Sequence, residues 1–190
     1  TIKQDFMVTT NDLQSYSKSY QYLNGEVTSS DFLDVETLQK MMAATQEGSD
    51  IKIKFETAVK GAKSYKFTVD SIKRDVNDTK LKLKWDGSKF DIDQKGEIEL
   101  DIPGKNTFKI VSATVEDESQ VLWLNFSDPI QKSQDFSGLV QVENAPNLRF
   151  ATAGNVLKVF FDTPITEEVL VEVFQGIESE DGIKMKEQFS

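Results

Sequence analysis

The sequence predicts a mainly all-β protein of two antiparallel β-sandwich domains, Ig-like or macroglobulin-like, the first of which contains one short helix. Short segments in which apolar and polar residues alternate run through most of the 190 residues. Small polar turn residues separate these segments at the spacing of an antiparallel sandwich. A Pro-Gly pair at residues 103 and 104 interrupts the pattern. Together these observations favour two sandwiches of roughly 90–100 residues each.

Four alternating segments define the first domain, which we expect to span residues 6–104. Each has the pattern of a sheet with one buried and one solvated face. The segments are residues 51–55, 65–69, 81–85 and 97–102. Residues 1–5 are expected to be a linker or the tail of a preceding domain. Thr1 is not an initiator Met and no apolar signal-peptide core follows it, so we expect a cut inside a longer protein or a trimmed mature end.

A single helix is predicted near residues 34–45. Asp34 is a good N-cap residue, and an acidic residue in the first turn complements the helix dipole. The apolar residues at helical spacing are Val35, Leu38 and Met42. This face is expected to pack on the sandwich, with one methionine of the adjacent pair Met41-Met42 in the core.

The second sandwich is expected to span residues 105–190, because proline cannot donate to a strand ladder and glycine relaxes the backbone. Its first strand should contain Phe108, Ile110 and Val115. The later strands are expected at residues 121–126, 138–142, 148–151, 156–161 and 169–174. Residues 121–126 are apolar at nearly every position, which predicts burial on both faces. Trp123 should therefore lie in the second core, and Asn125 should reach the turn at Asp128-Pro129.

Composition excludes several classes of function. The net charge of −10 argues against a nucleic-acid partner. The chain has no Cys and no His, which removes thiolate chemistry and the ordinary Ser or Cys triad. A helix that spans a membrane needs about 20 apolar residues. No apolar run in the sequence approaches this length, so no transmembrane segment is expected in this chain. We expect a non-enzyme with no catalytic, cofactor-binding or metal-binding residues. A carboxylate-based enzyme, with two acids about 5–10 Å apart in a cleft, remains an alternative.

Acidic segments were weighed as calcium sites. Residues 91–96 begin like a calcium loop, with acids at positions 1 and 3 and glycine at position 6. Lys95 at position 5 and Ile102 at position 12 break the pattern, which favours a tight turn with solvated acids. The clusters at residues 116–118 and 178–181 are expected to be exposed turns.

Two patterns bear on carbohydrates. Tripeptides that match the N-glycosylation sequon begin at Asn77 and Asn125, but the second lies in a strand that is predicted to be buried. Aromatic side chains exposed on one flat face could instead form a platform for a sugar. The candidates for such a platform are Trp85, Trp123, Tyr20 and Tyr22. Core packing is favoured for both tryptophans, because large aromatic residues dominate sandwich cores.

Several segments, taken in order, carry a resemblance to known proteins. Residues 120–130, Gln-Val-Leu-Trp-Leu-Asn-Phe-Ser-Asp-Pro-Ile, resemble a strand-and-turn element of bacterial Ig-like domains. The segments that continue the pattern downstream are residues 148–150, 154–159, 176–177 and 181–183. Those that precede it are residues 2–6, 24–25, the helix after residue 34, residues 67–72 and 85–87. In this order the chain resembles the amino-terminal part of bacterial α2-macroglobulin family proteins, the large envelope-associated members found in Bacteroides-like bacteria.

The resemblance implies a function that the residues alone do not. Family members are long chains of macroglobulin-like sandwiches in which a protease cleaves a bait segment and a Cys–Gln thioester, where present, captures it. This chain has no Cys and no recognisable bait stretch, so none of the family's reactive residues can be assigned to it. It is expected to be a non-catalytic scaffold segment of a protease inhibitor.

Location and partners follow from the same resemblance. The protein is expected in the periplasm or at the cell surface, anchored as a lipoprotein through the full-length chain. Its partners would be the other domains of that chain, and host or bacterial proteases through the whole protein. The alternative is a carbohydrate-binding or adhesin-type β-sandwich module of a cell-surface protein.

Overall fold

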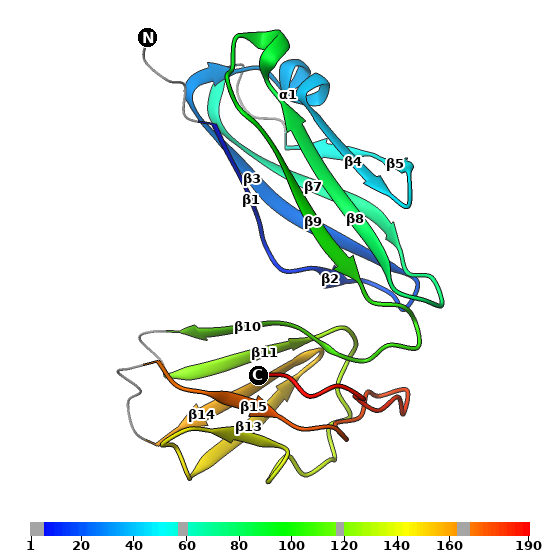
Figure 1. Cartoon of the computed structure of the whole chain (residues 1–190), viewed down its shortest axis with the longest axis vertical. Helices are drawn as coiled ribbons and strands as arrows, with labels where there is room; N and C mark the ends of the chain where they lie inside the picture. The colour runs from blue at the N-terminus through cyan, green and yellow to red at the C-terminus, as the bar shows by residue number, and fades with distance from the viewer. Residues whose placement is uncertain (1–5, 57–60, 117–119, 163–167) are drawn as a thin grey trace. The chain divides into compact units, whose positions relative to one another are not determined.

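The computed structural model describes residues 6–56, 61–116, 120–162 and 168–190, and the chain divides into two compact units, residues 1–104 and 105–190. Antiparallel strands make up most of each unit (Figure 1), and the predicted all-β sandwich class is confirmed. Within the described residues, no helix has both the length and the apolar character of a membrane span.

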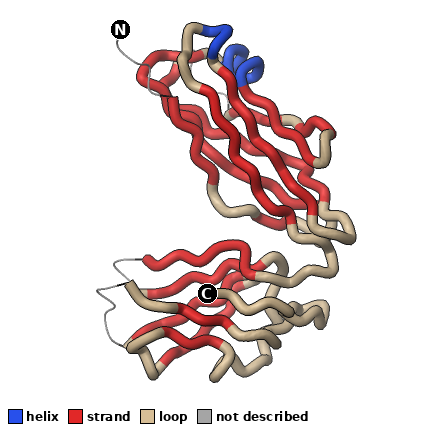
Figure 2. Tube along the Cα trace, viewed as in Figure 1, coloured by secondary structure: helices blue, strands red, loops and turns tan. Residues whose placement is uncertain are grey.

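Two antiparallel sheets enclose the core of the first unit. Sheet A has the order β1 (Phe6–Thr10), β3 (Tyr20–Leu33), β7 (Ala62–Lys73) and β6 (Ile53–Phe55), with β2 (Gln14–Ser15) also paired to β3. Sheet B has the order β5 (Ser49–Ile51), β4 (Met42–Gln46), β8 (Thr79–Asp86) and β9 (Lys95–Ile102). The helix α1 (Val35–Met41) and the 3-10 turn η1 (Ser88–Phe90) lie together at one end of this unit (Figure 2).

The long strands β3 and β7 run side by side through the centre of sheet A (Figure 1). Alternate residues of β3, including Leu23 and Val27, point into the core and are almost fully buried. Gly25 lies between them because the ring of Phe67 occupies the space where a side chain would be. A Cβ atom at Gly25 would lie 2.3 Å from Phe67 Cζ. Strand β3 was absent from the segments predicted above.

The helix begins after Asp34, as predicted, but it ends at Met41 instead of continuing to residue 45. Met42 has extended dihedral angles, φ −110° and ψ 138°, and pairs with Trp85 of β8 as the first residue of β4. Pairing with β8 therefore overrides the helix propensity of the alanines that follow. Met41 and Met42 are both buried, so both methionines, and not one, belong to the first core.

In the second unit, a broad sheet packs against a narrow one. Sheet C has the order β10 (Ile110–Glu116), β11 (Val121–Phe126), β14 (Val156–Phe161) and β13 (Leu148–Ala153). Sheet D contains β12 (Val140–Val142) and β15 (Val171–Val173), and an isolated bridge joins Val173 to Phe189. Strands β11 and β14 have the predicted bounds. The second core contains the inward residues of both sheets, among them Leu122, Leu124 and Phe126.

A buried arginine holds the end of the first unit. The Arg74 side chain is fully buried, and its Nε and Nη2 atoms donate to the carbonyl oxygens of Pro103 and Gly104, each at 2.8 Å. The backbone N–H of Gly104 in turn donates to Asp78 Oδ1 at 2.8 Å. Hydrogen bonds from a buried guanidinium are strong, and the carbonyls that it pairs would otherwise lack partners away from water. Arg74 thus fixes the backbone where the first unit ends.

Candidate functional site

Three of the four tyrosines of the chain gather on the outer face of sheet A. Tyr20 and Tyr22 alternate with inward residues of β3, so both point away from the core. Tyr16, in the turn between β2 and β3, folds back on Tyr22 with a ring-centroid distance of 5.7 Å and an interplanar angle of 26°. Tyr16 and Tyr20 are 55% and 42% exposed. Of the two tyrosines named as candidates for a sugar platform, Tyr20 is exposed, whereas Tyr22 is half-buried beneath Tyr16.

A β-bulge lies beside these rings. Gln21 of β3 is paired with Ile72 of β7, and Leu23 is paired with Val69, so two residues of β7 oppose the single residue Tyr22. The two residues of the bulge are Asp70 and Ser71. Ser71 has φ 63°, in the left-handed region that residues other than glycine rarely adopt. A bulge of this kind changes the direction of a side chain, and bulges are frequent next to binding sites.

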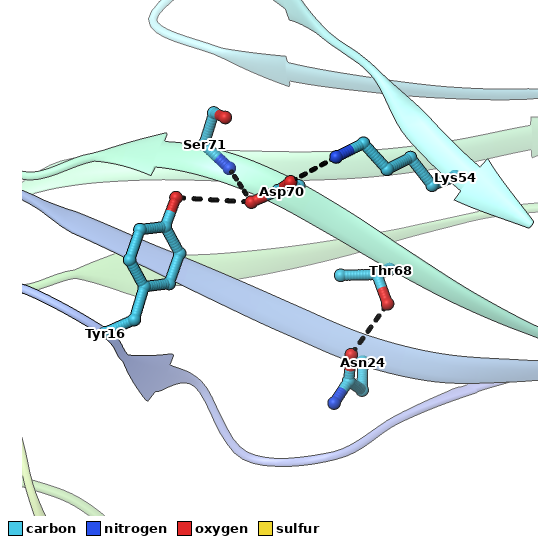
Figure 3. Close-up of polar contacts among 6 residues, drawn as sticks. All are labelled: Tyr16, Asn24, Lys54, Thr68, Asp70 and Ser71. Carbon is cyan, nitrogen blue, oxygen red and sulfur yellow. Dashed lines mark hydrogen bonds and ion pairs between the residues drawn. The ribbon is translucent and has the colours of Figure 1, made fainter.

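The carboxylate of Asp70 is the centre of the polar contacts in Figure 3. Its Oδ1 atom accepts a hydrogen bond from the Tyr16 hydroxyl at 3.2 Å and another from the backbone N–H of Ser71 at 2.8 Å. Its Oδ2 atom forms an ion pair with the Lys54 ammonium group. The hydrogen bond from Lys54 is the main reason that the pKa of Asp70 lies below its ordinary value, and the same contact raises the pKa of Lys54. Asp70 is therefore ionised at neutral pH.

Asn24 and Thr68 form a second polar pair on the same face. They are cross-strand partners on β3 and β7, and the Thr68 hydroxyl donates to Asn24 Oδ1 at 2.8 Å. Figure 3 shows the amide nitrogen of Asn24 on the side away from Thr68. No hydrogen bond from this nitrogen to another described residue is found. The amide can therefore donate to a ligand while its oxygen stays fixed.

The arrangement combines fixed aromatic rings with hydrogen-bonding groups. One face of the Tyr16 ring is backed by Tyr22, and its hydroxyl is held by Asp70. Side chains that are held in one geometry before binding lose less entropy when a ligand arrives. Nothing in this set resembles a nucleophile with its base. It is suited to recognition.

Tyr16, Lys54 and Asn24 were not identified as binding residues from the sequence. The closeness of Tyr16, Tyr20 and Tyr22 in one hairpin was a usable signal. The contribution of Lys54 could not be seen in the sequence, because it depends on the pairing of β6 with β7.

The two tryptophans have different environments. Trp85 packs against the first core as expected, with its ring over Gly96, where a Cβ atom would lie 2.3 Å from Trp85 Cζ2. Trp123 was expected in the second core, and this prediction is wrong. Leu122 and Leu124 point inward, so the residue between them points outward. Trp123 is half-buried on the outer face of sheet C, with Lys158 Nζ 4.1 Å from its ring centroid. A cation that covers this ring makes it a poor platform for a sugar.

The segments weighed as calcium sites lie partly in turns and partly at strand ends, because Lys95 begins β9 and Glu116 ends β10. Asp91 ends η1 with φ 58°, and Asp91 and Asp93 are exposed on either side of the buried Ile92. In the cluster at residues 178–181, Glu178 forms an ion pair with Lys184 at 3.1 Å. Residues 117–119, which include most of the other cluster, lie outside the described residues.

The two sequon asparagines also differ. Asn77 is exposed in the turn between β7 and β8. Asn125 is only 6% exposed, and its Oδ1 atom accepts a hydrogen bond from Asn155 Nδ2 at 2.6 Å. The prediction that Asn125 reaches the turn at Asp128-Pro129 is therefore wrong, because its amide oxygen bonds to the turn between β13 and β14 instead. A glycan could not be accommodated at this buried position.

Comparisons with known proteins do not identify the chain. In the part of the chain that the structure describes, no group of three or more acidic residues is placed to hold a metal ion. No protein-family model matches the sequence, and no curated protein shows significant similarity to it.

Proposed function

We propose that the chain is a non-catalytic scaffold segment of a large α2-macroglobulin-like protein of the bacterial cell envelope. The observation that carries this proposal is the pair of separate cores. The residues of the first core lie between Phe6 and Ile102, those of the second between Phe108 and Phe189, and the two sets share no member. Domains that each bury their own core can be joined in series, as a long protein of repeated sandwiches requires.

The end of the first unit supports the same proposal. Arg74 and Asp78 hold the backbone of Pro103 and Gly104 within the first unit. A chain that leaves a domain through fixed hydrogen bonds has fewer accessible conformations than a Gly/Ser-rich linker would have. A defined exit of this kind is useful in a protein that arranges many domains, because each domain must present the next one.

The order of sequence motifs supports the family, the location and the partners. The segment would act in the periplasm or at the cell surface, within a protein that is anchored to the membrane as a lipoprotein. Its direct partners are the neighbouring domains of the same chain. Proteases are partners of the whole protein, since the chain has no Cys to form the thioester that captures them.

A protease-capture assay tests this function. The 190-residue chain and the longer protein that contains it are incubated with trypsin, chymotrypsin and elastase and analysed on a denaturing gel. We expect no covalent adduct and no inhibition with the 190-residue chain. The longer protein should retain the protease. An adduct through a side chain of residues 1–190, or peptide hydrolysis by this segment alone, would contradict the proposal.

A further inference from the structure

We propose that the outer face of sheet A, around Tyr16, Tyr20 and the bulge at Asp70, binds a neutral β-linked oligosaccharide. This site is independent of the scaffold function and would add recognition to it. Four observations carry the inference: the exposed tyrosine rings, the fixed orientation of the Tyr16 ring, the hydrogen-bonding groups beside it, and the balance of charge at the site.

The tyrosine rings can supply the apolar contacts. A sugar ring with all its hydroxyl groups equatorial has flat faces made of C–H groups, and these pack on an aromatic face. Tyr16 is 55% exposed although one of its faces is covered by Tyr22. Tyr20 lies on the same side of β3 as Tyr22, about 7 Å away along the strand. The exposed rings therefore lie within the length of a short oligosaccharide.

Hydrogen-bonding groups lie next to the rings. The ionised Asp70 carboxylate can accept from sugar hydroxyls, and the Asn24 amide nitrogen and the Lys54 ammonium group can donate to them. All three side chains project from the same face (Figure 3). Asp70 is fixed by the Ser71 N–H in the left-handed bulge, so its acceptors are in place before a ligand binds. Strain in the backbone at this point is consistent with a binding role.

The charges of the site and of the whole chain favour some ligands over others. Asp70 and Lys54 neutralise one another at the site, and the chain as a whole carries a net charge of −10. Anionic polysaccharides would be repelled by the protein, and a cationic ligand would have to displace Lys54. The site therefore favours an uncharged ligand with many hydroxyl groups. The β-linkage follows from the extended sheet surface, because β-linked glucose chains are extended whereas α-linked chains curve.

Titration of the 190-residue protein with cellohexaose tests the proposal. Binding is followed by calorimetry and by amide shifts in a nitrogen-15 spectrum, with maltohexaose as the α-linked comparison. We expect a cellohexaose dissociation constant of about 0.1–1 mM. The shifts should concentrate at Ser71, Tyr22 and Asn24. Maltohexaose should bind at least about tenfold more weakly.

Variants separate the ring from its hydroxyl. Tyr16→Ala should weaken binding of cellohexaose by about tenfold, because it removes the exposed ring. Tyr16→Phe keeps the ring and loses only the contact to Asp70, so a smaller loss of about twofold to threefold is expected. Phe32→Ala is the matched control, because Phe32 is a 70% exposed aromatic residue elsewhere on β3 and should leave the affinity unchanged. The folding of each variant is checked from its amide spectrum.

The following outcomes would overturn the proposal. The first is the absence of amide shifts up to about 10 mM cellohexaose. The second is an affinity for maltohexaose equal to that for cellohexaose, and the third is a set of amide shifts at residues away from the bulge. Undiminished binding by a folded Tyr16→Ala protein would overturn it as well. Because the map of shifts is measured on the unsubstituted protein, the test does not depend on any variant folding.

Discussion

The two units are both sandwiches, but only the first opposes two broad sheets. Sheet A and sheet B each have at least four strands, whereas sheet C faces the two-stranded sheet D. The difference is visible in β10, the edge strand of sheet C. Val115 is paired with the core residue Leu122 and so points to the same side, yet it is 53% exposed. Because sheet D is narrow, it covers the central strands of sheet C. The inward-facing side chains of the edge strand β10 are left exposed to solvent.

This comparison explains how apolar residues are used in each unit. In the first unit the end of the sandwich is closed by α1 and Trp85, and the outer face of sheet A carries the tyrosines. In the second unit Trp123 lies on the outside, where Lys158 covers its ring. The apolar character of a residue therefore does not by itself show whether that residue is buried. The width of the opposing sheet decides which inward residues are buried.

The largest effect is expected from Arg74→Met. The substitution leaves the carbonyls of Pro103 and Gly104 without their buried donor, which should cost the first unit about 3–5 kcal/mol. Thermal unfolding followed by calorimetry should show a lower transition for the first unit and an unchanged one for the second. Lys73→Met is the control, because it removes the same charge from an exposed neighbour. Equal shifts of both transitions would show that the units are not separate.

In the second unit, Leu124→Ala should be more damaging than Trp123→Ala. Leu124 is fully buried in the second core, and its truncation should cost about 3 kcal/mol. Trp123→Ala should cost about 1–2 kcal/mol, from partial burial and the contact with Lys158. Chemical denaturation of both variants gives the comparison. If Trp123→Ala proved the more destabilising, the outward placement of this side chain would be wrong.

Val115 tests the exposed edge of sheet C. Val115→Thr should change stability by less than about 0.5 kcal/mol, since the side chain already contacts water. The same substitution at the buried Val159 places a hydroxyl in the core and should cost about 1–3 kcal/mol. Similar losses for the two variants, measured by urea unfolding, would mean that β10 is covered.

The smallest effect concerns acid titration of Asp70. Its pKa is lowered in the folded protein, so its stabilising contacts are fully present above the ordinary value of 3.8 and are lost as the pH falls through the lower folded value. Lys54→Met should raise the pKa of Asp70 part of the way back, because Ser71 and Tyr16 still donate to it. A carboxyl-carbon NMR titration measures the shift, with Lys66→Met as the control. An unchanged pKa would remove Lys54 from the site.

Sequence patterns predicted the elements whose signal is local. The bounds of β11 and β14 were read from apolar and alternating runs. Strand β3 was missed because its outward row is polar and the pair Asn24-Gly25 has the form of a turn. Gly25 is in fact required in the strand, since Phe67 of β7 fills its side-chain space. That requirement exists only after the two strands pair.

The candidate site illustrates the same limit. Tyr20 and Tyr22 were identified as possible platform residues from their aromatic side chains. Their position next to Asp70 depends on the bulge opposite Tyr22, which inserts one extra residue into β7. No run of residues in the sequence marks this bulge. The site was therefore only partly predictable, in Tyr20 and Tyr22 and not in Tyr16 or the polar residues.

Separate expression of residues 1–104 and 105–190 tests the central claim, that the chain consists of two independently folded sandwiches. Each fragment should show a dispersed amide spectrum and one cooperative thermal transition. The melt of the whole chain should equal the sum of the two fragment melts, because the two cores share no residue. A fragment that is unfolded alone, or a whole chain that melts in one transition absent from both fragments, would contradict the account.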